Sequence, residues 1–115
     1  MEIAVKQLQD GIRVVSLEGE MDLYNASDFK NQINQLFASG SHGIVIDLDR
    51  LEYIDSSGIS AMLYTFTQCK NRGIGLCFIN IKGSVRKVIE LTSLSGFFPI
   101  AEDLSTALGR IKANR

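Results

Sequence analysis

The segment Tyr53-Ile54-Asp55-Ser56-Ser57-Gly58-Ile59 joins two different hydrophobic patterns. Before it, residues 43–48 form a short and almost continuously apolar run, which is typical of a strand buried on both faces. After it, apolar side chains recur at helical spacing, at Ile59, Met62, Leu63 and Phe66. The Asp-Ser-Ser-Gly tetrapeptide therefore lies where a strand passes into a helix. Such a junction exposes backbone N–H groups and the positive end of a helix dipole, so it favours a capping hydroxyl or a phosphate group.

Strand and helix patterns alternate along the rest of the chain. Two apolar segments joined by the turn signal Asp10-Gly11 predict an N-terminal β-hairpin. Further strands are predicted at residues 44–48, 74–80 and 99–101, with residues 50–54 as a short connection. Helices are predicted to begin after a cap at Asn25 or Ser27, at Ser56 or Ser57, at Gly83, and after Asp103. The order β-β-α-β-α-β-α-β-α predicts an α/β domain with a mostly parallel, mixed sheet packed against about four helices.

The composition is that of one ordinary globular domain spanning residues 1–115. The chain is 45% hydrophobic and 22% charged, and its formal net charge is −1. It has no apolar run near the roughly 20 residues of a membrane helix and no recognisable signal peptide. Cys69 and Cys77 fall in apolar patterns without metal-ligand spacing, which predicts buried thiols in a reducing compartment. We therefore expect a cytoplasmic protein with no direct affinity for nucleic acid or membranes.

The chain lacks the residue combinations of the common enzyme sites. His42 is the only histidine, and it precedes the central strand, whereas Ser56 follows it. Because a strand of about six residues spans roughly 20 Å, His42 cannot serve as the base for a nucleophilic serine there. No Gly-x-Ser-x-Gly elbow, phosphate-binding loop or Gly-x-Gly-x-x-Gly motif is present. Asp47 and Asp49 share one strand face while Asp55 serves the helix, which disfavours a cation site. We predict that the protein is not an enzyme and holds no metal.

Two interpretations of Ser56 and Ser57 follow from their position. In the first, a serine hydroxyl caps the helix, which contributes about 1 kcal/mol. In the second, Ser56 is exposed and becomes phosphorylated, which adds close to two negative charges. Asp55 and Asp22 bring negative charge to the same region if the two loops meet, and a phosphate would then block a partner that docks there. Two adjacent serines allow one to cap while the other is modified. Position alone does not show which of the two serines is modified.

Three segments together resemble the STAS-domain anti-sigma factor antagonists, the bacterial regulators of partner-switching modules. They are the Gly-Glu-x-Asp segment within residues 17–22, the strand and serine loop within residues 45–59, and the C-terminal segment at residues 94–100. The tetrapeptide alone is a weak signal. In combination with an Asp-Leu strand at the right spacing and the Gly-Glu-x-Asp segment it is specific, and the resemblance covers nearly the whole chain.

The resemblance implies a phosphorylation switch at Ser56. This residue matches the serine phosphorylated by the cognate anti-sigma factor, which is itself a serine kinase. Asp22 and Asp55 match acidic residues beside that serine, and Ser57 and Gly58 belong to the same expected contact region. The unphosphorylated form would bind the anti-sigma factor and free a sigma factor, and a PP2C-type phosphatase would reset the switch. The nucleotide and magnesium belong to the kinase, so the chain is expected to need no cofactor and to be a monomer when free.

Two other functions are compatible with the same residues. One is a scaffold or sensor STAS subunit of a larger signalling assembly, without sigma factor control. The other is a small STAS domain that binds an anion or a nucleotide, with the helix N-terminus at residues 56–58 holding the phosphate. The acidic neighbours disfavour a free phosphate ligand, and they make a transient covalent phosphate on Ser56 the better interpretation.

Overall fold

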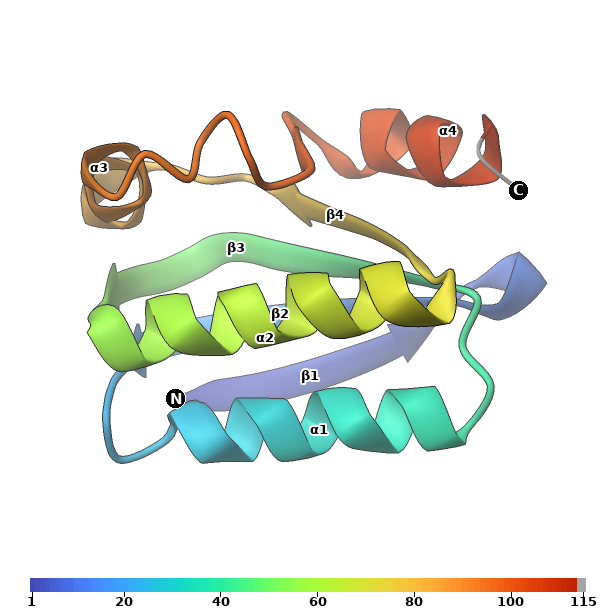
Figure 1. Ribbon diagram of the computed structural model, residues 1–115, viewed down its shortest axis with the longest axis horizontal. Coiled ribbons are helices and arrows are strands. Elements are labelled where there is room, and N and C mark those ends of the chain that lie inside the picture. The colour runs from blue at the N-terminus through green and yellow to red at the C-terminus, as the bar shows by residue number, and fades with distance from the viewer. Residues whose placement is uncertain (114–115) are drawn as a thin grey trace.

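Residues 1–113 are described by the computed structural model, and they form one mixed sheet with helices on both faces (Figure 1). The strands lie side by side in sequence order, and they are β1 (Glu2–Gln7), β2 (Ile12–Met21), β3 (Gly43–Ile54), β4 (Gly75–Ile79) and β5 (Ile100–Ala101). The helices are α1 (Ala26–Ala38), α2 (Ser56–Arg72), α3 (Gly83–Leu91) and α4 (Leu104–Ala113), with a short 3-10 turn, η1, at Gln9–Gly11. No helix among these residues is both long and apolar enough to cross a bilayer.

The predicted order of strands and helices and the mixed sheet are confirmed. β1 runs antiparallel to β2, and every later neighbour in the sheet is parallel. The parallel strands follow from the helical crossovers, because a helix that returns along the sheet brings the next strand back in the same direction. As a result, β2 and β3 end, and α1 and α2 begin, at the same end of the molecule (Figure 1).

The prediction that residues 50–54 are a connection is wrong. They continue β3 and pair with the last part of β2, up to the partners Met21 and Ile54. The register between these strands shifts twice, after Ser16 and after Gly19, so the extension is irregular. In this extension only Leu51 and Ile54 are buried, and the continuous apolar run of residues 43–48 is absent, which is why the pattern did not predict a strand.

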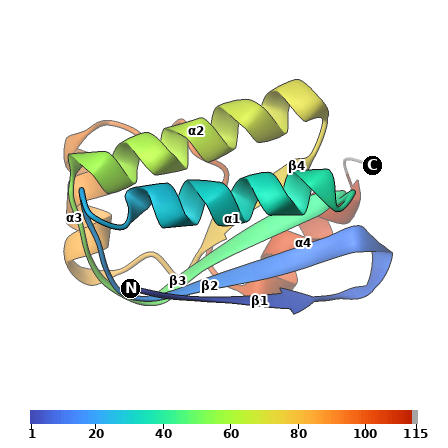
Figure 2. The same cartoon turned by 90° about the horizontal axis from the view of Figure 1, so that it is seen from below.

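The sheet separates a large core from a smaller one. α1 and α2 pack side by side on one face (Figure 2). Phe29 of α1 lies there in the same buried cluster as Ile46 of β3 and Phe78 of β4. α4 covers part of the other face, where Ile111 packs in the second cluster. Apolar burial on both faces is the main stabilising term of such a three-layer fold.

The two cysteines are buried, as predicted. Cys69 lies on α2 and Cys77 on β4, and neither forms a disulfide. Burial raises the pKa of Cys69 to about 12 and raises that of Cys77 as well. Both thiols therefore stay protonated at neutral pH and pack as small apolar groups.

The predicted helix caps have mixed outcomes. Asp103 caps α4 as expected, because its Oδ1 accepts a 2.8 Å hydrogen bond from Thr106 N, which lowers the pKa of Asp103. The predicted cap of α1 is confirmed in its position only: Asn25 occupies the N-cap position, but its side chain makes no capping bond, and Ser27 lies inside the helix. Instead, the Asn25 amide joins the loop to the end of β2, accepting from Asp22 N at 2.9 Å and donating to the Glu20 carbonyl at 2.8 Å.

Gly58 allows the first turn of α2 to lie directly on the ends of β2 and β3. A Cβ at this position would lie 2.3 Å from Ile54 Cγ1 and 3.3 Å from the Met21 carbonyl oxygen. Ile54 is itself buried, so it cannot move aside easily. We expect Gly58→Ala to lower the free energy of unfolding by about 1–3 kcal/mol, as overpacking does, measured by urea denaturation.

Gly109→Ala is the matched control for this substitution. Gly109 lies inside α4, and nothing is within 4 Å of its would-be Cβ. Alanine should therefore stabilise the protein by about 0.5–1 kcal/mol through helix propensity alone. If Gly58→Ala were as stable as the wild type, the close packing of α2 on Ile54 would be refuted.

Candidate functional site

The β2–α1 loop and the β3–α2 junction lie against each other at one end of the sheet. Asp55 N donates a 3.2 Å hydrogen bond to the Met21 carbonyl, directly beyond the last paired residues of β2 and β3. This bond brings Asp22, the next residue after Met21, beside the start of α2. The two loops therefore meet, and both acidic residues lie at the same end of the fold.

Asp55, not a serine, caps α2. Its Oδ1 accepts hydrogen bonds from Ser57 N at 2.9 Å and from Gly58 N at 3.2 Å. The prediction that Ser56 or Ser57 supplies the capping hydroxyl is therefore wrong. The cause is the length of β3: because pairing continues to Ile54, Asp55 is the first residue outside the strand and takes the cap position.

The cap leaves the two serines in different environments. Ser56 is the first residue of α2 and is exposed, whereas Ser57 is partly buried. Gly58 is buried beneath them and supports the junction through the close packing described above. Of the three, Ser56 is the residue that an approaching protein reaches most easily.

Two large side chains beside this junction were not predicted as site residues. Leu23 is 71% exposed and Tyr24 is 88% exposed, and both lie in the loop between β2 and α1. Asp22 shapes this loop, because its Oδ1 accepts a 2.9 Å bond from Tyr24 N. Their signal in the sequence is an apolar pair that belongs to neither the strand nor the helix pattern. We call the residues Asp22, Leu23, Tyr24, Asp55 and Ser56 the junction surface.

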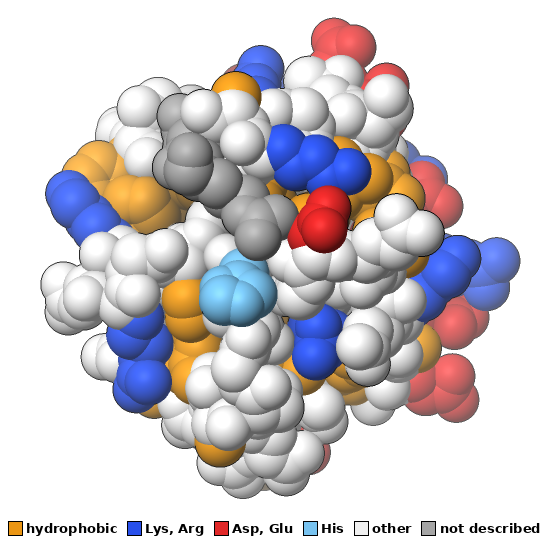
Figure 3. Space-filling view, turned by 90° about the vertical axis from the view of Figure 1, so that its right-hand side faces the viewer, with side chains coloured by type: hydrophobic (Ala, Val, Ile, Leu, Met, Phe, Trp, Pro, Cys, Tyr) orange, Lys and Arg blue, Asp and Glu red, His pale blue; other side chains and the backbone are white. Residues whose placement is uncertain are grey.

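His42 lies at the opposite end of the molecule from the junction surface. It precedes β3, where its N–H donates to the Gly11 carbonyl at 2.8 Å and its carbonyl accepts from Gly75 N at 3.1 Å. Figure 3 shows the chain's one histidine at the surface of that end. The full length of β3, 12 residues, separates it from Ser56, so the predicted separation is confirmed and His42 cannot act on that hydroxyl.

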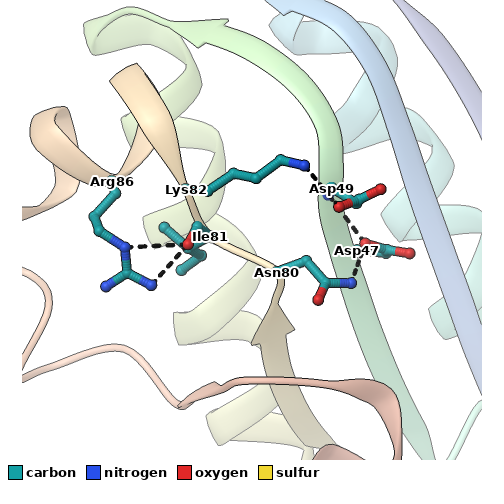
Figure 4. A network of polar contacts seen from close by, with 6 residues as sticks. All are labelled: Asp47, Asp49, Asn80, Ile81, Lys82 and Arg86. Carbon is teal, nitrogen blue, oxygen red and sulfur yellow. Dashed lines mark hydrogen bonds and ion pairs between the residues drawn. The ribbon is translucent and has the colours of Figure 1, made fainter.

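The two strand aspartates take part in a polar network on the sheet face opposite α1 and α2 (Figure 4). Asp47 Oδ1 accepts from Asn80 Nδ2 at 2.9 Å and from Asp49 N at 3.0 Å. Lys82 Nζ lies 2.9 Å from Asp49 Oδ1, and this bond lowers the pKa of Asp49. These contacts tie the start of α3 to β3, which is a structural role. Within residues 1–113, no three His, Cys, Asp or Glu side chains are placed to hold a metal ion.

Two substitutions of Asp55 distinguish the contribution of its capping hydrogen bonds to stability from the contribution of its charge. Asp55→Ala should lower the free energy of unfolding by about 1 kcal/mol, because Ser57 N and Gly58 N lose their acceptor. Asp55→Asn keeps an acceptor oxygen and should stay within a few tenths of a kcal/mol of the wild type. Both changes in the free energy of unfolding are to be measured by denaturant unfolding. Equal losses in the two variants would mean that the charge, and not the cap, stabilises the junction.

Comparison with known proteins finds several anti-sigma factor antagonists. Anti-sigma-F factor antagonist RsfB of Mycobacterium tuberculosis is 30% identical over 108 residues, covering 92% of this chain and 86% of RsfB. The crystal structure of an anti-sigma factor antagonist from Mycobacterium paratuberculosis superposes with a TM-score of 0.85 at 28% identity, covering 96% of this chain and 93% of that one.

A more distant structure shares the fold. The anti-sigma factor antagonist SpoIIAA in its unphosphorylated form gives a TM-score of 0.82 at 20% identity, and the match covers 97% of both chains. The family model of the STAS domain matches residues 4–107, which span β1 to α4. With this match across nearly its whole length, the chain belongs to the STAS-domain family.

Proposed function

We propose that this chain is an anti-sigma factor antagonist whose binding is switched by phosphorylation of Ser56. In its unphosphorylated form it binds an anti-sigma factor that is also a serine kinase, and this binding frees a sigma factor. A PP2C-type phosphatase removes the phosphate. The kinase brings the nucleotide and magnesium, so the chain itself acts as a binding protein in the cytoplasm and not as an enzyme.

One observation carries the proposal: Ser56 is exposed at the first position of α2 while Asp55 supplies the cap. The Ser56 hydroxyl is therefore not used to hold the helix, and its modification leaves the cap intact. The relatives named as anti-sigma factor antagonists support the class of partner. A serine that is exposed and dispensable for folding is suited to act as a reversible switch.

The junction surface explains how a phosphate on Ser56 would reduce binding. Leu23 and Tyr24 present exposed apolar area that a partner can cover. A phosphate adds close to two negative charges beside this area, next to the carboxylates of Asp22 and Asp55. A partner that docks over Leu23 and Tyr24 would have to desolvate that charge or oppose it, and either costs binding free energy.

The Asp55 cap disfavours the anion-binding and nucleotide-binding alternatives. A free phosphate at a helix N-terminus depends on the unpaired N–H groups of the first turn. Here Ser57 N and Gly58 N already donate to a carboxylate. A free anion would have to displace Asp55 or lie beside its negative charge, whereas a covalent phosphate on Ser56 requires neither.

Phosphate transfer tests the proposed site. The purified chain is incubated with ATP, magnesium and the serine-kinase anti-sigma factors of the same genome, and the modified residue is located by mass spectrometry. We expect one phosphate, on Ser56, and none on Ser56→Ala. Ser57→Ala is the matched control, since it removes the neighbouring hydroxyl and should still be phosphorylated. Modification at another residue, or none with any of these kinases, would refute Ser56 as the switch.

Charge at Ser56 should weaken binding without unfolding the protein. We expect Ser56→Asp to raise the Kd for the anti-sigma factor at least about tenfold, or about 1.4 kcal/mol, by calorimetric titration. Its unfolding midpoint should stay close to that of the wild type, since the α2 dipole favours negative charge there. Ser105→Asp adds the same charge at an exposed position of α4 and should bind as the wild type does. Equal affinity of all three proteins would overturn the electrostatic account.

A further inference from the structure

The outer edge of β1 is the long unpaired edge of the sheet. The sheet order places β1 and β5 at the two edges, and β5 has only 2 residues. β1 has 6 residues, pairs with β2 on one side only, and is exposed at most positions. Figure 2 shows it as the outermost strand, with nothing beyond it. An exposed edge of this length is a template for pairing with another strand.

The pairing of β1 with β2 determines which backbone groups face outward. Residues opposite each other in an antiparallel pair alternate between hydrogen-bonded and non-bonded. Leu8 N donates to the Ile12 carbonyl at 2.8 Å, so the pair Leu8 and Ile12 is of the bonded kind. The unbroken register from there makes the even-numbered residues of β1 bond to β2. The N–H and C=O groups of Ile3, Val5 and Gln7 therefore point out of the sheet.

The side chains of β1 have a charge pattern that complements itself. In Glu2-Ile3-Ala4-Val5-Lys6, an antiparallel copy centred on Ala4 places Glu2 opposite Lys6 and Ile3 opposite Val5. The same register brings together the outward N–H and C=O groups of Ile3 and Val5. The registers centred on Ile3 or Val5 also satisfy the backbone, but neither places Glu2 opposite Lys6. Opposite charges across a strand pair stabilise it, so the register centred on Ala4 is favoured.

Among the described residues, the two charged side chains, Glu2 and Lys6, have no ion-pair partner. The cross-strand neighbour of Glu2 is Glu18, which has the same charge. Lys6 lies opposite Val14. Val5 is 40% exposed on the face that carries α1 and α2, where the Ile3 side chain of a second copy would cover it.

We propose that two copies of this chain associate through β1, antiparallel and centred on Ala4, so that their sheets become continuous. This proposal departs from the free monomer that the family resemblance implies. A single edge strand buries little area, so the dimer is weak and depends on concentration. The two-fold axis is perpendicular to the sheet. It therefore directs the two junction surfaces toward opposite ends of the dimer, and each stays accessible to its own partner. This inference does not depend on the proposed function.

Charge reversal tests the register. By sedimentation velocity over a wide concentration range, the wild type should form dimers. Lys6→Glu and Glu2→Lys should each remain monomeric, because like charges then face each other twice. An equimolar mixture of the two variants should form dimers again, since every Glu then faces a Lys. Lys87→Glu makes the same change at an exposed position of α3 and should dimerise as the wild type does.

A cysteine at the two-fold axis gives a second measurement. Ala4 is exposed, and in this register the two Ala4 residues form a closely spaced non-bonded pair. Ala4→Cys should therefore form a disulfide-linked dimer under mild oxidation, whereas Gln7→Cys, also exposed on β1, should do so much less. The native thiols are buried and should not interfere. A wild type that stays monomeric throughout, or a dimer that survives both charge reversals, would overturn the proposal, and neither result would bear on phosphorylation of Ser56.

Discussion

The pairing of β2 with β3 up to Met21 and Ile54 determines the geometry of the end of the molecule that carries the junction surface. The next residue, Asp55, donates its backbone N–H to the Met21 carbonyl, and this bond ends the strand. Because the strand ends there, the Asp55 carboxylate reaches Ser57 N and Gly58 N and starts α2. One register between two strands thus places the cap, the first residue of the helix and the neighbouring loop together.

If Ser56 is the switch proposed above, this arrangement separates the contacts that stabilise the junction from the residue that is modified. The groups that hold the junction are the Asp55 carboxylate, the backbone of Met21 and the absence of a side chain at Gly58, which lets α2 lie against Ile54. Ser56 takes part in none of these contacts, although it lies between Asp55 and Ser57 in the sequence. A charge placed on Ser56 therefore changes the surface that a partner meets while the packing below it remains. Such a division is what a reversible covalent switch requires, since the switched state has to remain folded.

The sequence predicted the parts of the fold that depend on apolar periodicity. The order of elements and the buried cysteines followed from it, because burial sets the apolar pattern, and the mixed sheet followed from the alternation of strands and helices. The far half of β3 did not, since at residues 50–54 pairing with β2 continues where apolar side chains no longer mark it. The cap of α2 was not identified for the same reason: Asp55 was expected to serve the helix, but Asp55, Ser56 and Ser57 are all good capping residues, and only the end of β3 selects among them. Leu23 and Tyr24 were missed because exposure in a loop follows no period.

The edge of β1 and the junction surface occupy different parts of the sheet. The junction surface forms where parallel strands end, whereas the edge runs along the side of the antiparallel strand. Pairing along that edge leaves the ends of β2 and β3 unchanged, so the proposed self-association and the proposed phosphorylation use different residues. A dimer with two outward-facing junction surfaces could engage two anti-sigma factors, or one assembly with repeated subunits, and would gain affinity only in the second case, where both ends bind at once. Whether the two functions reinforce each other therefore depends on the oligomeric state of the partner and not on any contact between the two surfaces within this chain.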